Sequence, residues 1–325
     1  ILQSAITRNV RSFNAQDIAN ILNAMAKLGL SLEGLEELLQ SAISRNAEHF
    51  NAQDIANTLN AMAKLGLSAD DLEVILRSAI TRNVRSFHAL NIANTLNAMA
   101  KLGLSVDGLV VILRSAISRN VRSFNAQDIA NTLNAMAKLG LSPEGLEELL
   151  QAAISRNAEH FNAQGIANAL NAMANLGLSV DGLVVILRSA ISRNVRSFNA
   201  QEIANTLNAM AKLGLSVNGL ENILGSAITG NAESFNAQNI ANTLNAMAKL
   251  GLSVNGLENI LRSAITRNVR SFNALNVANT LNAMAKLGLS VNGLENILQS
   301  AITRNAESFN AQEIANTLNA MAKLG

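Results

Sequence analysis

The chain has no cysteine, tryptophan or tyrosine, and a single proline among 325 residues. Without cysteine, disulfides, thiolate catalysis and cysteine-ligated metals are excluded. No run of about 18 apolar residues occurs, so no membrane-spanning helix is expected. Histidine is also scarce, with three residues, and no Ser/His/acid arrangement, phosphate-binding glycine loop or metal-ligand spacing is visible. We therefore expect no enzyme, no cofactor or metal, and no small-molecule substrate.

What the chain does contain is enough apolar sequence to build a core. Hydrophobic residues make up 49% and charged residues 15%, with a formal net charge of +2, which argues against disorder. No signal or transit peptide is visible. The chain starts at Ile1 without an initiator methionine, so we expect it to be part of something longer, and its cellular location stays open.

The dominant feature is an internal repeat. All nine methionines are spaced by 37 residues, and the nine phenylalanines keep the same spacing. A fixed period of this size is typical of a solenoid. Positions within the unit are numbered from 1 at Leu30 to 37 at Gly66 and repeat along the chain. A partial unit, 1–29, is followed by eight full units, at 30–66, 67–103, 104–140, 141–177, 178–214, 215–251, 252–288 and 289–325.

Each unit predicts two antiparallel helices. In the first, serine at position 2 is an N-cap, Pro143 fits the first helical site, and apolar residues at positions 6, 9, 10, 13 and 14 form a helical stripe. In the second, Asn51 is the N-cap with an acid three residues on, and Gly66 suits a left-handed ending with Leu67 packed back on Met62. We therefore predict an all-α fold, a right-handed α-solenoid of nine stacked helical hairpins.

One face of the second helix is polar in every unit. It carries positions 24, 28, 31 and 35, which are Gln or Leu, Asn, Asn and mostly Lys. Asparagine is a poor helix former, so two in each helix need a reason. Amide ladders between repeats and a groove lined with hydrogen-bonding groups are both open. Position 24 holds Gln16, Gln53, Leu90, Gln127, Gln164, Gln201, Gln238, Leu275 and Gln312. Position 28 holds Asn20, Asn57, Asn94, Asn131, Asn168, Asn205, Asn242, Asn279 and Asn316.

The 25 basic residues fall at only four positions, 11, 16, 19 and 35. Compensation of helix dipoles explains much of this placement. The edge where the first helix turns into the second is nevertheless net basic and presents free helix N–H groups, which favours anion binding. The candidate phosphate-binding residues at position 16 are Arg8, Arg45, Arg82, Arg119, Arg156, Arg193, Arg267 and Arg304. Position 19 alternates Arg and Glu along most of the chain, which favours a surface charge ladder between repeats over ligand contact.

Position 25 varies inside an otherwise nearly constant helix. It holds Asp17, Asp54, Asn91, Asp128, Gly165, Glu202, Asn239, Asn276 and Glu313. Polar residues that differ in donor and acceptor pattern can discriminate base edges, and helical-repeat proteins use two or three such side chains for each base. Drift at a tolerant capping site is the alternative, although Gly165 lacks the capping acceptor.

The segment FNAQDIANTLNAMAKLGLS resembles the octotricopeptide repeat, whose units share the A-N and A-x-A-K-L-G pattern, and the resemblance covers essentially the whole chain. It implies an α-solenoid that binds single-stranded RNA, typically in organelle gene expression, with related arrays in some bacteria. Two features depart from that family: the period is one residue shorter, and position 31 holds Asn where an aromatic is often found. The near-identity of the units also resembles TAL effectors, whose motif is absent, and keeps DNA open.

Together these patterns predict modular binding of single-stranded RNA, at about one nucleotide per repeat. Arginines at positions 16 and 19, with the N-termini of the second helices, would bind phosphates. Positions 24 and 25 would contact bases, with the Asn at 28 beside them. The alternatives are a protein-interaction scaffold and TAL-effector-like DNA binding. We expect a monomer that does not enter a membrane.

Overall fold

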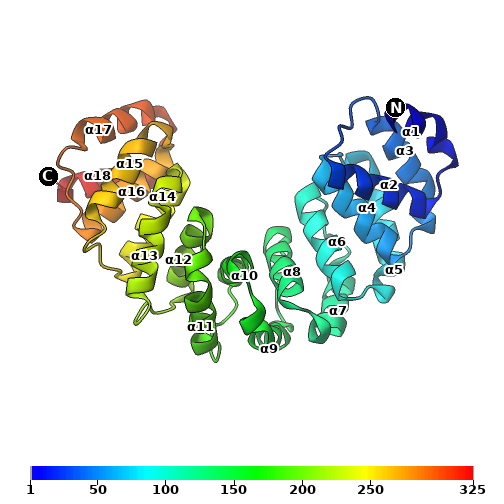
Figure 1. The fold of residues 1–325 in the computed structure, drawn as a ribbon, viewed down its shortest axis with the longest axis horizontal. Helices are drawn as coiled ribbons and strands as arrows, with labels where there is room; N and C mark the ends of the chain where they lie inside the picture. Colours follow the sequence, from blue (N-terminus) through cyan, green and yellow to red (C-terminus); the bar gives the residue numbers. More distant parts are fainter. Residues whose placement is uncertain (1, 325) are drawn as a thin grey trace. The chain divides into compact units, whose positions relative to one another are not determined.

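The computed structural model describes residues 2–324, and within them the chain is helical, without strands. This confirms the predicted all-α class. The chain forms two compact units, one ending at Asn157 and the other starting at Ala158, and Figure 1 labels their helices. Among the described residues no helix combines the length and apolarity that crossing a membrane requires.

The α-helices of the N-terminal unit are α1 (Leu2–Asn9), α2 (Ala15–Leu28), α3 (Glu36–Asn46), α4 (Ala52–Leu65), α5 (Glu73–Asn83), α6 (Ala89–Leu102), α7 (Val110–Asn120), α8 (Ala126–Leu139) and α9 (Glu147–Asn157). Those of the C-terminal unit are α10 (Ala163–Leu176), α11 (Val184–Asn194), α12 (Ala200–Leu213), α13 (Glu221–Asn231), α14 (Ala237–Leu250), α15 (Glu258–Asn268), α16 (Ala274–Leu287), α17 (Glu295–Arg304) and α18 (Ala311–Leu324). Odd numbers are first helices and even numbers are second helices.

Short 3₁₀ segments follow the first helices. They are η1 (Val10–Ser12), η2 (Ala47–His49), η4 (Val84–Ser86), η5 (Val121–Ser123), η6 (Ala158–His160), η7 (Val195–Ser197), η8 (Ala232–Ser234), η9 (Val269–Ser271) and η10 (Ala306–Ser308). One further segment, η3 (Asp70–Leu72), precedes α5.

The second helices begin and end as the sequence predicts. At α4 the Asn51 side chain accepts from the Asp54 N–H at 3.0 Å, and the Asp54 carboxylate accepts from the Asn51 N–H at 3.2 Å. This is a capping box, which satisfies two helix-end groups at once. Gly66 has a φ of 71°, and the N–H of Leu67 donates to the Met62 carbonyl at 3.0 Å. The predicted left-handed ending is therefore confirmed.

The first helices begin later than predicted. α3 starts at Glu36, because the Ser31 hydroxyl accepts from the Glu33 N–H at 3.1 Å and so closes a turn. Gly34 then adopts a φ of 73°, a conformation that glycine allows and a right-handed helix cannot continue through. The prediction that serine at position 2 caps the α-helix is wrong. It caps the turn, and Pro143 lies in the equivalent turn ahead of α9.

The core lies between the first helices and the second helices of the stacked repeats. In the unit 30–66 it contains Leu39 and Ile43 from α3 and Leu59 and Met62 from α4, all fully buried. Phe50 joins them, with 2% of its surface exposed. The seven internal phenylalanines are all buried in the same way, so their rings are not available for stacking on a base.

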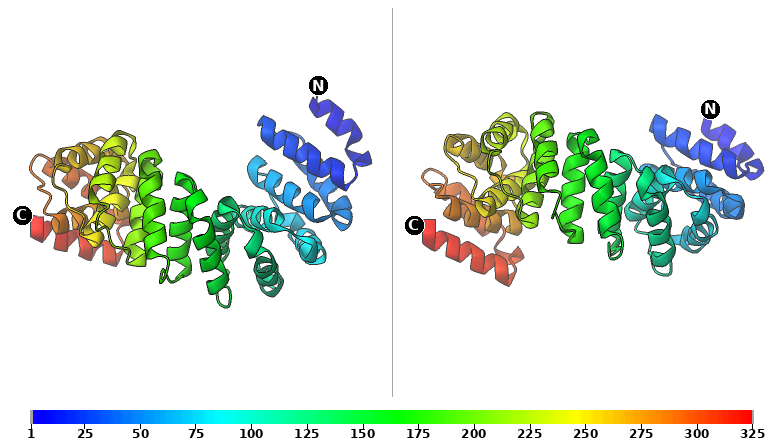
Figure 2. Two further views of the ribbon diagram at one scale, coloured as in Figure 1. Left: turned by 60° about the horizontal axis from the view of Figure 1, so that its bottom comes forward. Right: turned by 90° about the horizontal axis from the view of Figure 1, so that it is seen from below.

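The second helices form a continuous layer within each unit. α2, α4, α6 and α8 pack side by side in sequence order, as do α10, α12, α14, α16 and α18, and Figure 2 shows them stacked. A first helix contacts mainly the second helix of the preceding repeat and the 3₁₀ segments of the preceding repeat and of its own. This stacking confirms the solenoid, and it places the polar face of the second helices on one surface of each unit.

Candidate nucleic-acid interface

The second-helix face consists of the side chains at positions 24, 28, 31 and 35 of the even-numbered helices. On α4 these are Gln53, Asn57, Asn60 and Lys64. Residues three and four apart lie on the same side of a helix, so the four form one stripe. Gln53 and Lys64 are exposed, whereas the two asparagines are half-buried. The stripe is therefore open to solvent and rich in amides.

Some of these amides bond to one another. Within a helix, position 24 donates to position 28 in three repeats, from Gln53 to Asn57 at 2.9 Å, from Gln127 to Asn131 at 2.9 Å and from Gln201 to Asn205 at 2.8 Å. Between repeats, the Asn91 amide donates to Gln53 at 3.2 Å and the Asn239 amide donates to Gln201 at 2.9 Å. An amide ladder thus exists in places, and it joins position 25 of one repeat to position 24 of the repeat before it.

Other amides of this face have no partner. Within residues 2–324, the position-31 asparagines make no side-chain hydrogen bond, and the Nδ2 groups at position 28 donate to no acceptor. Each amide group carries two donors and an acceptor. Every second helix therefore presents open hydrogen-bonding groups to whatever lies on the face.

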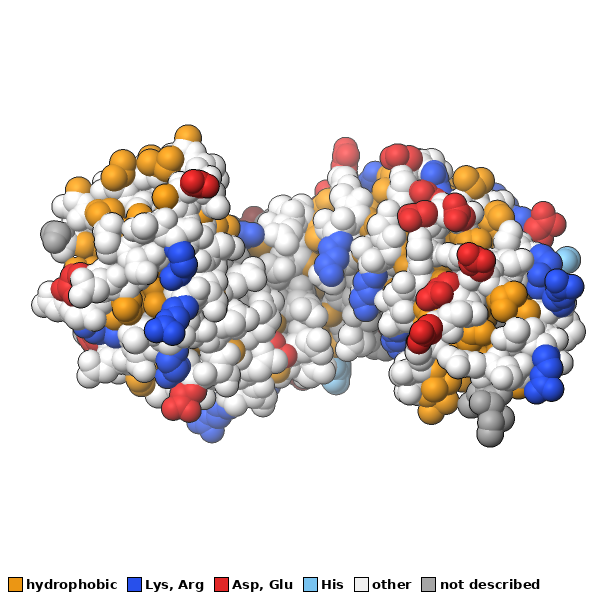
Figure 3. Space-filling view, turned by 90° about the horizontal axis from the view of Figure 1, so that it is seen from above, with side chains coloured by type: hydrophobic (Ala, Val, Ile, Leu, Met, Phe, Trp, Pro, Cys, Tyr) orange, Lys and Arg blue, Asp and Glu red, His pale blue; other side chains and the backbone are white. Residues whose placement is uncertain are grey.

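A row of lysines borders these amides. All eight position-35 lysines are exposed, and in the part of the chain described here only Lys212 has a partner, the Asn175 side chain at 3.1 Å. The single ion pair among the described residues, between Arg77 and Glu73, involves none of these lysines. The C-terminal unit, at the left of Figure 3, shows basic side chains following one another across an otherwise mainly uncharged surface. The second-helix face thus carries positive charge that no carboxylate compensates by direct contact.

Position 25, predicted to contact bases, is turned toward the backbone. Asp54, Asn91, Asp128 and Asn239 are buried, with 1% to 6% of their surface exposed. Asp, Glu and Asn there all accept from the N-cap N–H, as Glu202 does at 2.9 Å. The shared capping role explains why several residue types are tolerated. Base contact at position 25 stays a prediction that this burial argues against, whereas positions 24 and 28 are accessible.

The position-16 arginines tie adjacent repeats together. In seven of them one Nη donates to the backbone carbonyl 35 residues earlier: Arg45 to Val10, Arg82 to Ala47, Arg119 to Val84, Arg156 to Val121, Arg193 to Ala158, Arg267 to Ala232 and Arg304 to Val269, at 2.7 to 3.2 Å. Arg8 donates instead to Ser4 of its own helix. The guanidinium groups remain exposed, and their binding of phosphate stays a prediction.

Sequence reasoning missed a second hydrogen bond between repeats, which the asparagine at position 17 makes. The Asn83 amide donates both to the Phe50 carbonyl of the preceding repeat, at 2.9 Å, and to the Ala79 carbonyl of its own helix, at 3.1 Å. The same pair of bonds recurs in every repeat from Asn46 to Asn305. An asparagine at position 17 in all nine units was the available signal.

The charge ladder predicted at position 19 does not form by direct contact. Arg85 and Glu48 are exposed, and among the described residues no position-19 arginine lies within ion-pair distance of a carboxylate. These arginines are free cations at the edge of the hairpins. Within residues 2–324 no group of three or more His, Asp and Glu side chains could hold a metal ion.

Comparison with known proteins gives one family. A family model described as RNA-editing substrate-binding complex 6 protein matches the chain twice, over residues 3–160 and 111–325. The two matches overlap, as expected when one model is aligned with a repetitive chain, and together they span nearly all of it. No curated protein matches the sequence. The octotricopeptide resemblance is a different assignment and stays a prediction.

Proposed function

The chain belongs to the RNA-editing substrate-binding complex 6 protein family, and on that premise we propose that it binds single-stranded RNA across the second-helix face. The observation that carries this proposal is the recurrence, along the second helices, of unpaired amides beside lysines that, within residues 2–324, are all unpaired except Lys212. The family description names an RNA-editing substrate, and this face offers the chemistry that an RNA strand requires.

The lysines and the asparagines of this face have distinct roles in this proposal. Lysines at position 35 neutralise phosphates, which supplies most of the affinity and makes it salt-dependent. The amides at positions 28 and 31 donate to and accept from base edges and ribose 2′-hydroxyls. Neighbouring helices pack about 8–10 Å apart, which matches about one nucleotide per repeat. The chain acts by binding and performs no catalysis.

The second-helix face is nearly identical from one repeat to the next, which predicts an RNA target of simple, repeated sequence. Positions 28 and 31 are Asn throughout, and position 24 changes only at Leu90 and Leu275. Readout by this face therefore favours a tract of one repeated base, with a different preference opposite the two leucines. Readout by position 25 would instead give a mixed sequence that follows Asp, Asn, Gly and Glu along the chain.

Selection from a random pool of single-stranded RNA, with single-stranded DNA in parallel, tests the proposal. We expect enrichment of a tract of about eight nucleotides in RNA, and weaker enrichment in DNA, which lacks the 2′-hydroxyl. A mixed motif whose bases follow the residue types at position 25 would show that position 25 discriminates the bases. No enrichment in either pool at low salt would overturn RNA binding and favour the protein-interaction alternative.

A further inference from the structure

Helix α13 differs from the other first helices by two glycines. Gly225 stands at position 11, where the other units have Gln or Arg, and Gly230 stands at position 16, where they have Arg. Beside them lies an open groove of about 640 Å³, bounded by α13 and by the turn at 252–257 that precedes α15. We call this the α13 groove. A Cβ on Gly225 would come no closer than 4.0 Å to Leu257, and one on Gly230 would meet nothing within 4 Å, so the groove is space that the absent side chains leave.

The neighbouring repeats show what occupies this space when position 11 is arginine. Arg262 donates to the Ser290 carbonyl at 2.6 Å and also to the Asn292 carbonyl. Arg188 donates to the Asn218 carbonyl. These carbonyls stand at positions 2 and 4 of the following unit, and their equivalents in the α13 groove belong to Ser253 and Asn255. The site is therefore a socket for a guanidinium group, built from backbone acceptors.

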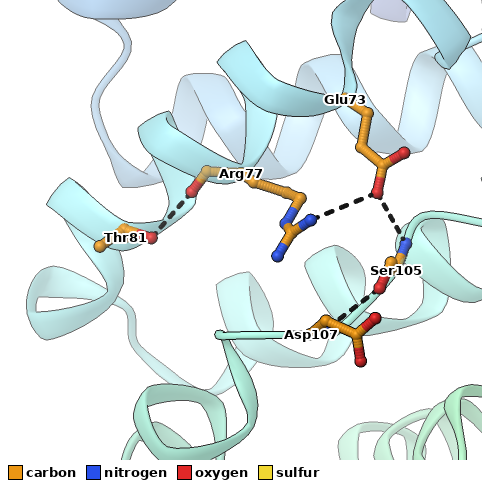
Figure 4. Close-up of polar contacts among 5 residues, drawn as sticks. All are labelled: Glu73, Arg77, Thr81, Ser105 and Asp107. Atoms are coloured by element: carbon orange, nitrogen blue, oxygen red, sulfur yellow. Dashed lines mark hydrogen bonds and ion pairs between the residues drawn. The ribbon is translucent and has the colours of Figure 1, made fainter.

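In another repeat, a carboxylate at position 7 lies beside the position-11 arginine. In the unit 67–103, Glu73 at position 7 lies 3.6 Å from Arg77 and accepts from the Ser105 N–H at 3.2 Å, as Figure 4 shows. Glu221 occupies the same position on α13 and lines the groove.

The α13 groove keeps these acceptors without a cation. Among residues 2–324 no side chain donates to the Ser253 or Asn255 carbonyl, and no cation pairs with Glu221. Position 11, which supplies the arginine in the sister repeats, is glycine on α13. The groove thus combines one carboxylate with carbonyl oxygens that the sister repeats use to hold a guanidinium.

We propose that the α13 groove binds an arginine side chain of a partner protein. A guanidinium has a planar set of five N–H donors, which suits a carboxylate and two carbonyls together, whereas a lysine ammonium is a point charge without this fork. The groove offers no cation to a phosphate, so it is distinct from the RNA-binding face proposed above. Its occupant is a protein, recognised through one arginine.

The probe for a direct test is Nα-acetyl-arginine amide, followed by ligand-observed NMR against the whole chain. Gly225→Arg fills the groove with the side chain that the sister repeats carry, and we expect it to weaken probe binding by at least about tenfold. Gly225→Ala is the matched control, because a methyl group leaves the groove open and binding should be unchanged. Both variants remove a glycine from a helix interior and should raise the melting temperature, so loss of binding in the first cannot be attributed to unfolding.

Three further measurements sharpen the assignment. Glu221→Gln should weaken the probe about tenfold, whereas Glu258→Gln, at a socket already filled by Arg262, should not. Nα-acetyl-lysine amide should bind at least about tenfold more weakly than the arginine probe. Arg262→Gly should open a second socket and raise the stoichiometry from about one to about two. Equal binding to the wild type and Gly225→Arg, or equal binding of the lysine and arginine probes, would overturn the proposal.

Discussion

Replacing Lys64, Lys101 and Lys138 with glutamine removes three neighbouring charges from the second-helix face of the N-terminal unit. All three are exposed, and within residues 2–324 none has a hydrogen-bond or ion-pair partner, so the fold should be unaffected. Each phosphate contact to a single strand contributes about 0.7 to the slope of log K against log salt. Three contacts amount to about 2, so between 50 and 200 mM salt the wild type should lose roughly 20-fold more affinity than the variant.

Fluorescence anisotropy with a labelled RNA from the selection, measured across that salt range, gives both slopes. The matched control is Arg11, Arg85 and Arg122→Gln, which removes the same charge from position 19, where the arginines are equally exposed. We expect the control to change the slope by less than about 0.7. The opposite result is an unchanged slope for the lysine variant and a drop of about 2 for the arginine variant. It would show that the phosphates bind at the edge of the hairpins, and it would refute RNA binding across the second-helix face.

Three further changes test a bond between repeats, a buried hydroxyl and a helix cap. Asn83→Ala removes the tie to the Phe50 carbonyl and leaves that acceptor unpaired, so chemical denaturation should show a loss of about 1–3 kcal/mol. Thr132→Val removes a buried hydroxyl that has no hydrogen-bond partner within residues 2–324 and keeps the shape of the side chain, so the stability should rise by up to about 1 kcal/mol. Gly165→Asp restores the capping box of α10 and removes a helix glycine, and thermal unfolding should show a gain of about 1 kcal/mol.

These outcomes separate structural roles from binding roles. If Asn97→Ala, at the open position 31, cost as much stability as Asn83→Ala, the tie at position 17 would not be what holds the repeats. A destabilised Thr132→Val would mean that the hydroxyl has a partner in solution. If Gly165→Asp changed the RNA preference at one nucleotide, base contact at position 25 would be supported. A change in stability alone would support a capping role for this position.

The sequence by itself determined the architecture, because the repeat and the local rules agree. The 37-residue period, the Asn and Gly that begin and end each second helix, and the apolar stripes predicted stacked hairpins that the structure confirms. Only the start of the first helix was misplaced, because in seven of the eight full units a glycine with positive φ interrupts the chain there. The exposed polar stripe was also predictable, since positions 24, 28, 31 and 35 share one side of any α-helix.

Only the tertiary structure decided which polar side chains remain available to a ligand. Arg45, predicted to bind phosphate, donates to a carbonyl 35 residues earlier, and Asp54, predicted to contact a base, is buried against the N-cap of its own helix. The α13 groove likewise depends on carbonyls of the following repeat. The repeat period and the helix propensities of the sequence describe each helix by itself. The availability of a donor depends on which backbone groups the neighbouring repeat places beside it, and packing alone sets that.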